Sequence, residues 1–388
     1  DNVSKSISEN KKIVNDLASS APVDADKVSK MRPGEEVTYK KRGDKKNSKG
    51  QVSNVGYVCP ECNCPDVSKE RQFRCMFQTV LGPLDPIKEF VSECYNKNLS
   101  ETEFYEKLSQ EIARSSVYLR PETAQGMFVQ FLNICKTTAA KIPFGIAQIG
   151  KSFRNEIIVE HFIFRSCEFE QMEMEFFCEP GDQLKWLDYW KDERLNWYKK
   201  FANNPDKFRL REHTKDELAH YSDKCYDIEF LYPWGWDELE GVASRTDYDL
   251  KKHAQSSGSK LSYFDQNAVD PTTGKKGWRY TPYVIEPAAG VDRGVLAVLN
   301  EAYKVEKLEG GKERTVLSFK PHLSPIKAAV IPLKRNDEEL VKKAKSLKGE
   351  LQSLGIGRIL LENSGNIGKS YRRHDEAGTP LCITVDFQ

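Results

Sequence analysis

Apolar side chains recur along the chain with two different periods, and the period separates predicted helices from predicted strands. Helical spacing is clearest at Met127, Phe128, Phe131, Leu132 and Cys135. The segment "VYLRPE" before them therefore predicts an extended stretch that leads into an amphipathic helix. Further helices are predicted for "DPIKEFVSECYNKN", for "SETEFYEKLSQEIARSS" and for the Trp-rich region 181–222.

Alternating positions predict strands between these helices. Strand-like patterns begin at "VGYVCPEC" and "RQFRCMFQTVLGP", and residues 146–156 and 164–178 are joined by a loop short enough for an antiparallel hairpin. Two more strands are predicted in "KCYDIEFLYPWGWDELEGVASRTDYDL", followed by a polar loop around 255–277. "WRYTPYVIEPAAGVDRGVLAVLNEAY" then predicts a strand that turns into a helix. This order predicts an α+β fold for residues 50–317.

The pattern changes near Pro321. "IKAAVIPL" is a continuous apolar run, an amphipathic helix is predicted for 336–354, and "RILLEN" and "LCITVDF" follow. Alternation of helices with nearly continuous apolar strands predicts a separate small α/β domain.

Composition limits the class of protein. The chain has 388 residues, 39% of them hydrophobic, which favours two or three globular domains. It has no apolar run of membrane length and no apolar signal segment, so we expect a soluble cytoplasmic protein without membrane association. The 10 cysteines are mostly isolated, and we expect no structural disulfides.

The net charge of +1 excludes a strong overall attraction for nucleic acid. From Phe319 onward, twelve Lys and Arg stand against eight Asp and Glu, which leaves this region at +4. That balance fits contacts with phosphates, and it equally fits a solvated helix face. Residues 1–50 are polar and Lys-rich, which predicts a helix followed by a mobile basic segment.

Candidate chemistry comes from the parity of residues 164–178. Residues two apart on a strand share a face, which puts a ring, an amide and two carboxylates on one side: Phe169, Gln171, Glu173 and Glu175. Sulfur and aromatic side chains face the other way: Met172, Met174 and Phe176. A half-exposed sheet with water on its polar side gives the same alternation.

Further charged positions favour a site. Arg154 and Glu156 have the same parity on the predicted neighbouring strand, and more carboxylates occur at predicted strand or turn ends, namely Glu122, Glu238 or Glu240, and Glu286. Converging carboxylates repel unless an ammonium group or a divalent metal compensates them. Arg154, Arg245 and Arg293 carry planar guanidiniums suited to phosphate.

These segments resemble a known family. "FRNE" followed by a loop and "FIFRSCEFEQMEME" resembles motif 2 of class II aminoacyl-tRNA synthetases, and "YVIEPAAGVDRGVLAVL" resembles motif 3. Together with "YLRPETAQG", "FGIAQIGKSFRNE", "ELEGVASRTDYDL" and "GKSYRRHDEAGTPLCITVD", they are similar to the dimeric type of glycyl-tRNA synthetase. The similarity runs from about Val55 to the last residue.

The resemblance implies a class II synthetase-like antiparallel sheet flanked by helices. It implies an N-terminal polar segment at 1–54, a catalytic domain at 55–318 with a helical insertion at about 181–222, and an anticodon-binding α/β domain at 319–388. It also implies a homodimer that binds glycine and tRNA-Gly and uses ATP and Mg²⁺. Motif 1 is not recognisable, and the family pattern continues beyond "CITVDFQ", so both ends are expected to be incomplete.

Residue roles follow from the same resemblance. Three arginines are implied in catalysis, with Arg154 at the α-phosphate of ATP, Arg293 at the γ-phosphate and Arg245 near the activated carboxyl. Glu156 would bind the adenine amino group and Phe169 would stack on the base. The other implied ATP-binding residues are Asn155, Phe164, Arg165, Ser166, Cys167, Glu168, Glu238, Leu239, Gly290, Val291 and Asp292. The implied glycine-binding residues are Glu122, Phe169, Glu170, Gln171, Met172, Glu173, Glu286, Pro287, Ala288, Ala289 and Gly290.

Three points remain open at this stage. Glu238 or Glu240 is implied as a magnesium ligand. Cys59 and Cys62 in "CPECNC" form half of a zinc ribbon without a second pair nearby, so free thiols are the favoured interpretation and Zn²⁺ the alternative. Ala288 stands where the family usually has a small hydroxyl residue, which affects the amino-acid assignment more than the class.

Two other functions are considered. A catalytically inactive paralogue of the same fold could serve as a nucleic-acid-binding accessory subunit, but it would not be expected to keep Arg154, Glu156, Phe169 and Arg293 together. A sister synthetase for threonine, proline or histidine is disfavoured by "RPETAQG" and by the three pocket glutamates.

Overall fold

A computed structural model describes residues 45–46, 52–53, 75–81, 85–94 and 99–387. The chain divides into two units, residues 1–74 and 75–388. In the first unit, β1 (Lys45–Lys46) pairs with β2 (Val52–Ser53) in an antiparallel ladder. The first of these strands, β1, lies in the segment 1–50 whose basic end the sequence predicts as mobile, and β2 follows it. The rest of the N-terminal prediction, with Cys59 and Cys62, lies outside the described residues.

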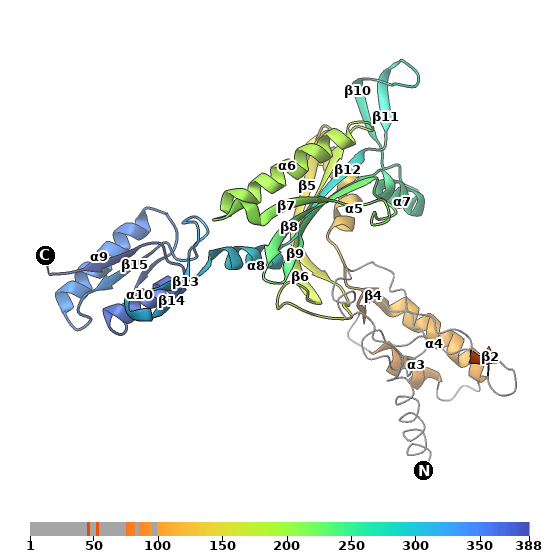
Figure 1. The fold of residues 1–388 in the computed structure, drawn as a ribbon. Helices are drawn as coiled ribbons and strands as arrows, with labels where there is room; N and C mark the ends of the chain where they lie inside the picture. Colours follow the sequence, from red (N-terminus) through yellow and green to blue (C-terminus); the bar gives the residue numbers. More distant parts are fainter. Residues whose placement is uncertain (1–44, 47–51, 54–74, 82–84, 95–98, 388) are drawn as a thin grey trace, which may run out of the picture. The chain divides into compact units, whose positions relative to one another are not determined.

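A six-stranded antiparallel sheet organises the second unit (Figure 1). Its strand order is β5-β6-β12-β9-β8-β7. The strands are β5 (Phe144–Phe153), β6 (Glu168–Cys178), β7 (Phe208–Glu212), β8 (Lys224–Tyr232), β9 (Gly235–Thr246) and β12 (Tyr283–Gly290). The fold therefore has the predicted α+β class, with the predicted antiparallel hairpin β5–β6, and the two further predicted strands β8 and β9 also pair antiparallel.

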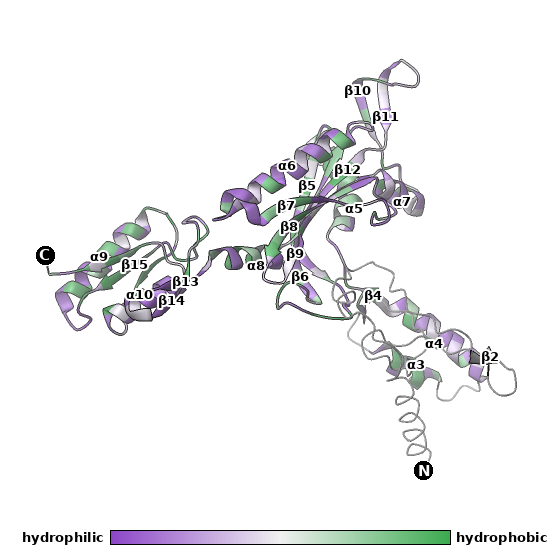
Figure 2. Cartoon of the chain, in the orientation of Figure 1, coloured by the Kyte–Doolittle hydropathy of each residue, from purple (hydrophilic) through white to green (hydrophobic). Residues whose placement is uncertain are grey.

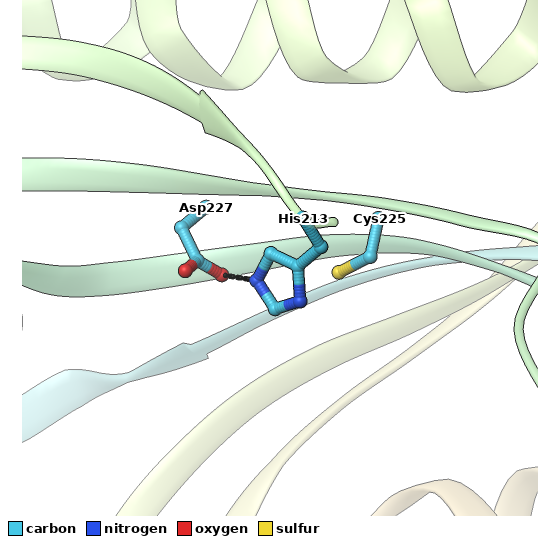
Figure 3. A group of neighbouring side chains, drawn as sticks. All are labelled: His213, Cys225 and Asp227. Atoms are coloured by element: carbon cyan, nitrogen blue, oxygen red, sulfur yellow. Dashed lines mark ion pairs between the residues drawn. The ribbon is translucent and has the colours of Figure 1, made fainter. Parts of the chain in front are cut away.

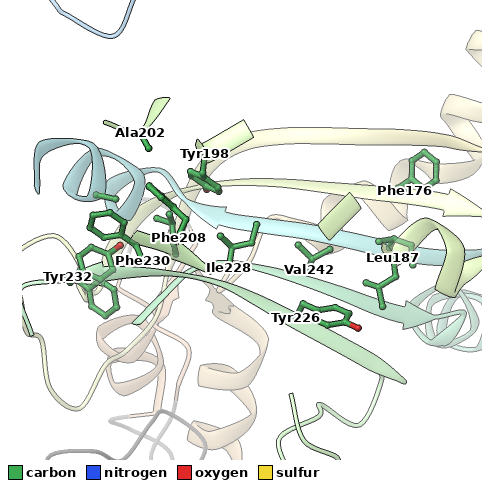
Figure 4. Packing of buried hydrophobic residues seen from close by; sticks show 14 of the residues in the cluster. Phe176, Leu187, Tyr198, Ala202, Phe208, Tyr226, Ile228, Phe230, Tyr232 and Val242 are labelled. Carbon is green, nitrogen blue, oxygen red and sulfur yellow. The ribbon is translucent and has the colours of Figure 1, made fainter. Parts of the chain in front are cut away.

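Two sets of helices cover the two faces of this sheet. Helices α6 (Gln183–Phe201) and α8 (Val291–Ala302) pack on one face through the main apolar cluster, which Figure 4 shows at close range. Helices α5 (Ala124–Thr138) and α7 (Tyr248–Ser257) pack on the other face at the end where β6 finishes. Hydrophilic and hydrophobic residues alternate along α6, as expected for a helix with one buried side (Figure 2).

Strand parity explains which side chains reach each face. Met174 and Phe176 of β6 pack toward α6, whereas Phe177 packs with α5 in the other cluster. The alternation predicted for β6 is therefore confirmed. The polar face left uncovered by α5 and α7 carries the charged residues described below.

Smaller elements surround the sheet. α3 (Pro86–Cys94) and α4 (Glu101–Ser115) confirm two predicted helices, and α4 begins with a capping box between Ser100 and Glu103. Three short ladders pair β3 (Gln78–Val80) with β4 (Ser116–Tyr118), β10 (Tyr263–Val269) with β11 (Lys276–Tyr280), and β13 (Tyr303–Lys307) with β14 (Glu313–Leu317). Two 3₁₀ turns complete these elements, Pro205–Lys207 and Glu309–Gly311.

The C-terminal residues form a parallel sheet of order β16-β15-β17. Its strands are β15 (Ala328–Pro332), β16 (Ile359–Leu361) and β17 (Cys382–Val385), and its helices are α9 (Glu338–Ser353) and α10 (Ile367–Glu376). β15 is buried at every position, which explains its continuous apolar sequence. The predicted α/β class of this region is confirmed, while the domain bounds stay predictions.

The sequence prediction is wrong in three places. Region 181–222 is not helical throughout, because residues 208–212 form edge strand β7, which pairs with β8, and turns follow the strand. The polar segment 255–277 is not a loop, because it contains the end of α7 and the β10–β11 hairpin. The motif 2 strands are shorter than predicted, because β5 ends at Phe153 and β6 begins at Glu168. Each difference comes from pairing with a distant strand or from a turn.

Membrane-spanning helices and disulfides can be assessed only for the residues that the structure describes. No helix among them is long and apolar enough to span a bilayer. The cysteines in the described ranges are free.

Candidate active site

Four carboxylates approach one guanidinium on the open face of the sheet. Glu173 and Glu175 of β6 lie beside Glu286 of β12, and one carboxylate oxygen from each lies within 4.8 Å of the others. Glu122, from the turn before α5, completes the group that we call the acidic pocket. Arg245 of β9 is the guanidinium.

Arg245 is held by contacts on several sides. Its Nη1 donates to Glu286 Oε2 at 2.5 Å, and its Nε donates to Asp249 Oδ2 at 2.8 Å. Nη2 lies 3.8 Å from Glu122 Oε1, and the guanidinium carbon lies 4.2 Å from the ring centre of Tyr221. Only 3% of the Arg245 side chain is exposed, so its orientation is fixed by the pocket rather than by solvent.

Burial changes the acidity of the pocket carboxyls. Burial, followed by the charge of Glu286, raises the pKa of Glu173 to about 7. Burial also raises the pKa of Glu175 well above its ordinary value, and the same cause raises the pKa of Glu286 against the opposing effect of Arg245. With Arg245 as the cation of the pocket, ionisation of all these carboxyls together is therefore disfavoured, and a bound ammonium group would favour their ionised forms.

Hydrogen bonds orient Glu173 within the pocket. Thr123 Oγ1 donates to Glu173 Oε2 at 2.5 Å, and Gln171 Nε2 donates to Glu173 Oε1 at 2.9 Å. Gln171 is fixed in turn by Ser152, whose hydroxyl donates to its Oε1 at 2.9 Å. Glu175 is fully buried, and its carboxyl has no partner other than the neighbouring carboxyl of Glu286 among the described residues.

Phe169 lies at the other end of the same face. The guanidinium carbon of Arg154 lies 5.4 Å from the Phe169 ring centre, while Arg154 Nε donates to Pro121 O at 3.1 Å. Arg154 follows the end of β5, and its backbone N–H donates to Cys167 O across the hairpin at 3.0 Å. A flat ring and a guanidinium thus lie next to each other at the start of β6, which suits a base and a phosphate.

The first turn of α8 supplies a third basic group. Gly290 is the N-cap residue of this helix. Arg293 Nε donates to Phe164 O at 3.0 Å, and Arg293 Nη1 lies 3.4 Å from Glu238 Oε2. Asp292 Oδ2 accepts from the backbone N–H of Glu170 at 2.9 Å, which fixes α8 against β6. Hydrogen bonds thus connect Asp292 and Arg293, in the segment that resembles motif 3, to the segment that resembles motif 2.

This surface has the parts that a phosphoryl-transfer site needs. Arg154 lies beside the Phe169 ring and Arg293 lies in the first turn of α8, while the acidic pocket, with one guanidinium among four carboxyls, lies farther along β6. Such groups can position an anion and an ammonium at a fixed separation without a general base.

Comparison with known families agrees with this geometry. Residues 106–302 match the family "tRNA synthetase class II core domain (G, H, P, S and T)", and residues 327–388 match the family "Anticodon binding domain". The chain belongs to the class II tRNA synthetase family. The resemblance in motifs 2 and 3 is therefore confirmed.

Individual relatives are similar over most of this synthetase chain. The "Glycine--tRNA ligase" of Deinococcus radiodurans is 52% identical over 281 residues, which is 70% of this chain and 55% of that protein. The protein of the same name from Geobacillus thermodenitrificans is 46% identical over 337 residues, which is 87% of this chain and 64% of that protein. The chain thus spans between about half and two thirds of the length of these relatives.

A solved structure is similar in fold. Prolyl-tRNA synthetase from Cryptosporidium parvum, complexed with L-proline and AMP, gives a TM-score of 0.52 at 16% identity, over 70% of this chain and 54% of that chain. At this identity the likeness shows the class II fold alone.

The synthetase fold brings most of the predicted site residues to one face, and several lie elsewhere. Glu240 points to the opposite face, where its carboxylate accepts from Arg194 Nε at 2.6 Å and from Tyr198 at 2.7 Å. This placement excludes Glu240 as the magnesium ligand. Leu239 and the Phe164 ring are buried in the cluster under α6. Met172, Pro287 and Ala289 alternate with the pocket residues and also face away from the pocket.

The other predicted positions surround the site or lie at its edge. Ala288 lies on the same face of β12 as Glu286, and it is paired with Glu173 of the neighbouring strand β6. Arg165 forms an ion pair with Glu160, Glu168 forms one with Lys151, and Ser166 donates to Glu168 O. Arg154 and Glu156 follow β5 rather than belonging to it, so their predicted strand parity does not apply.

Sequence reasoning missed several groups that shape the pocket. Glu175 had the right parity but was not assigned to the amino-acid site. Thr123 and Gln125 come from the start of α5, and Gln125 Nε2 donates to Glu122 Oε1 at 2.7 Å. Asp249 lies four residues after Arg245, and that spacing is a recognisable signal only once α7 is known to begin at Tyr248.

Proposed function

We propose that this chain carries the catalytic and anticodon-binding parts of a glycine–tRNA ligase. It activates glycine with ATP and transfers the glycyl group to the 3′ end of tRNA-Gly, as a step of protein biosynthesis. The observation that carries the proposal is the acidic pocket, in which a single guanidinium faces four carboxyls and two of these carboxyls belong to the same strand as Phe169.

The pocket suits the ammonium group of a small amino acid. Glu122, Glu173 and Glu286 bind the ammonium, and the buried Glu175 adds negative charge behind them. A pocket cannot grip the absent side chain of glycine, so it selects glycine by holding the ammonium firmly and leaving no room at Cα. A larger amino acid then clashes with the sheet surface.

The nucleotide binds at the start of β6. Phe169 stacks on adenine, Arg154 neutralises the α-phosphate and Arg293 meets the γ-phosphate. Glu238 is exposed beside Arg293 and remains a candidate to bind the Mg²⁺ that accompanies ATP. Bound magnesium would neutralise phosphate charge.

The chemistry follows from positioning. The glycine carboxylate attacks the α-phosphorus and pyrophosphate leaves. This nucleophile is already ionised at neutral pH, so no general base is needed. In the second step a terminal ribose hydroxyl of tRNA attacks the carbonyl of the adenylate, AMP leaves and glycine is transferred. The C-terminal α/β region binds the anticodon end, with its excess of basic residues toward phosphates.

The alternative of an inactive accessory subunit is not favoured, because the relatives that are about half identical are named glycine--tRNA ligases. A homodimer and a cytoplasmic location stay predictions.

The decisive experiment is pyrophosphate exchange by the full-length protein with each of the twenty amino acids. Exchange should depend on glycine, and Arg154→Ala should reduce it by roughly 10²–10³-fold while the protein stays folded. Arg279→Ala is a matched control, because Arg279 lies 4.9 Å from the Phe264 ring centre outside the site. Exchange with another amino acid but not with glycine would reject the substrate, and tRNA binding without any exchange would favour the accessory subunit.

A further inference from the structure

A second group of polar side chains lies toward the β7–β8 edge of the same sheet. His213 follows β7, while Cys225 and Asp227 belong to β8. One donor atom from each lies within 4.8 Å of the others, and Figure 3 shows the three side chains pointing toward one another. The proposed ligase function uses none of them.

The register of the two strands brings these residues together. Cys225 and Asp227 are two residues apart on β8 and therefore share a face. The pairing of Glu212 with Tyr226 places His213 opposite Cys225, and the His213 N–H donates to Cys225 O at 3.0 Å. The triad is thus fixed by backbone pairing on two adjacent strands, which is a rigid support for ligands.

Asp227 is oriented as a metal-binding carboxylate usually is. Arg211 Nη2 donates to Asp227 Oδ2 at 2.8 Å and leaves Oδ1 toward His213. His213 Nε2 lies 2.8 Å from this Oδ1 in an ion pair, so the ring nitrogen and the carboxylate oxygen face each other. A ligating carboxylate whose second oxygen is hydrogen-bonded is the common outer-shell arrangement of metal sites.

Ion pairs hold the carboxylates next to the triad in place. Arg209 contacts Glu229, and Arg211 contacts Glu217, Asp227 and Glu229. The orientation of Asp227 toward His213 is therefore fixed by neighbouring charges as well as by the strand.

The donor types decide which metal fits. A thiolate, an imidazole and one carboxylate oxygen favour zinc over magnesium or calcium, which prefer oxygen ligands alone. Asp227 is 6% exposed and the His213 side chain 19% exposed, so the group is largely buried and still has a path to solvent.

We propose that His213, Cys225 and Asp227 bind one zinc ion, with a water molecule in the fourth tetrahedral position. The ion links the residue after β7 to β8 and thereby fixes both ends of the connecting segment 213–223. That segment contains Tyr221, whose ring contacts Arg245 of the acidic pocket. The zinc therefore supports one side of the pocket without contacting the substrate.

The test uses cobalt(II) as a spectroscopic substitute for zinc in the full-length protein after treatment with a chelator. Cys59, Cys62 and Cys64 are changed to Ser in the background, so that a second cysteine site does not contribute. We expect one equivalent of cobalt to give thiolate-to-metal charge-transfer absorption in the near ultraviolet, and one equivalent of zinc to remove it.

Variants in this background locate the site. Cys225→Ser should abolish the charge-transfer band, and His213→Ala should weaken zinc binding at least about tenfold. Cys135→Ser is the matched control, because it removes a half-buried thiol of α5 and should leave the band unchanged. Circular dichroism checks that each variant is folded, and His213→Ala decides the matter if Cys225→Ser does not fold. Absence of the band in the background, or its persistence in Cys225→Ser, overturns the proposal whatever the result of the glycine exchange assay.

Discussion

Replacing Glu173 by glutamine tests whether the acidic pocket costs stability. The ionised form of Glu173 is disfavoured in the folded chain, where burial raises its pKa from 4.5 to about 7. Because the folded state then binds the proton more tightly than the unfolded state, stability falls as the pH rises between these two values. The loss is complete above pH 7 and amounts to about 3 kcal/mol.

Glutamine keeps the size and the contacts but cannot ionise. Its oxygen can accept from Gln171 Nε2, and its amide N–H can donate to the Thr123 hydroxyl, which turns to accept. We therefore expect Glu173→Gln to gain stability relative to the unchanged protein as the pH rises, by about 2 kcal/mol between pH 5.5 and pH 8. The same variant should lose glycine-dependent exchange.

The assay is denaturant unfolding followed by tryptophan fluorescence at several pH values. Trp186, Trp190 and Trp197 pack against the sheet under α6 and report on its unfolding. Subtracting the two proteins at each pH removes titrations that they share. Glu212→Gln, at an exposed ion pair with Lys224, is the control and should give a difference near zero at every pH. If the difference in unfolding free energy between Glu173→Gln and the unchanged protein did not vary with pH, the reasoning would be refuted. That result would mean that the Glu173 carboxyl has the same pKa in the folded and unfolded states.

Three further outcomes are expected. The apparent affinity for glycine should rise as the pH increases through about 7, because Glu173 must be ionised to bind the ammonium, and a KM that is unchanged from pH 6 to pH 8 would contradict this. Phe169→Ala should raise the KM for ATP roughly tenfold through loss of stacking, while the KM for glycine changes little; equal effects on both would place the ring elsewhere than at the base. Arg194→Met should destabilise the fold by about 3–5 kcal/mol, because it leaves the buried carboxylate of Glu240 without its cation and with Tyr198 alone as a donor, and unfolding at an unchanged denaturant concentration would argue against that ion pair.

The sequence by itself determined much of the local structure. The sequence identified helices α3, α4, α5 and α9, with amphipathic spacing as the signal for α5 and α9, and alternation identified which side chains of β6 face the site. These features depend on residues close together in the chain and on which side of a helix or strand is buried. The spacing of the apolar residues indicates both. The motifs were also local enough to indicate the class II family.

Tertiary structure alone decided the features that depend on distant partners. The β7 strand is too short to be distinguished from a helix end until β8 pairs with it, and Glu240 turns to the back of the sheet where a bulge shifts its register with β8. Arg245, Asp249 and Glu175 became one pocket only when β6, β9, β12 and α7 came together. Likewise, His213 and Cys225 are twelve residues apart in the chain, and the antiparallel pairing of β7 with β8 makes them neighbours. Burial sets which carboxyls are ionised, and pairing between distant strands sets where their side chains lie. The order of residues along the chain does not reveal which distant side chains will become neighbours.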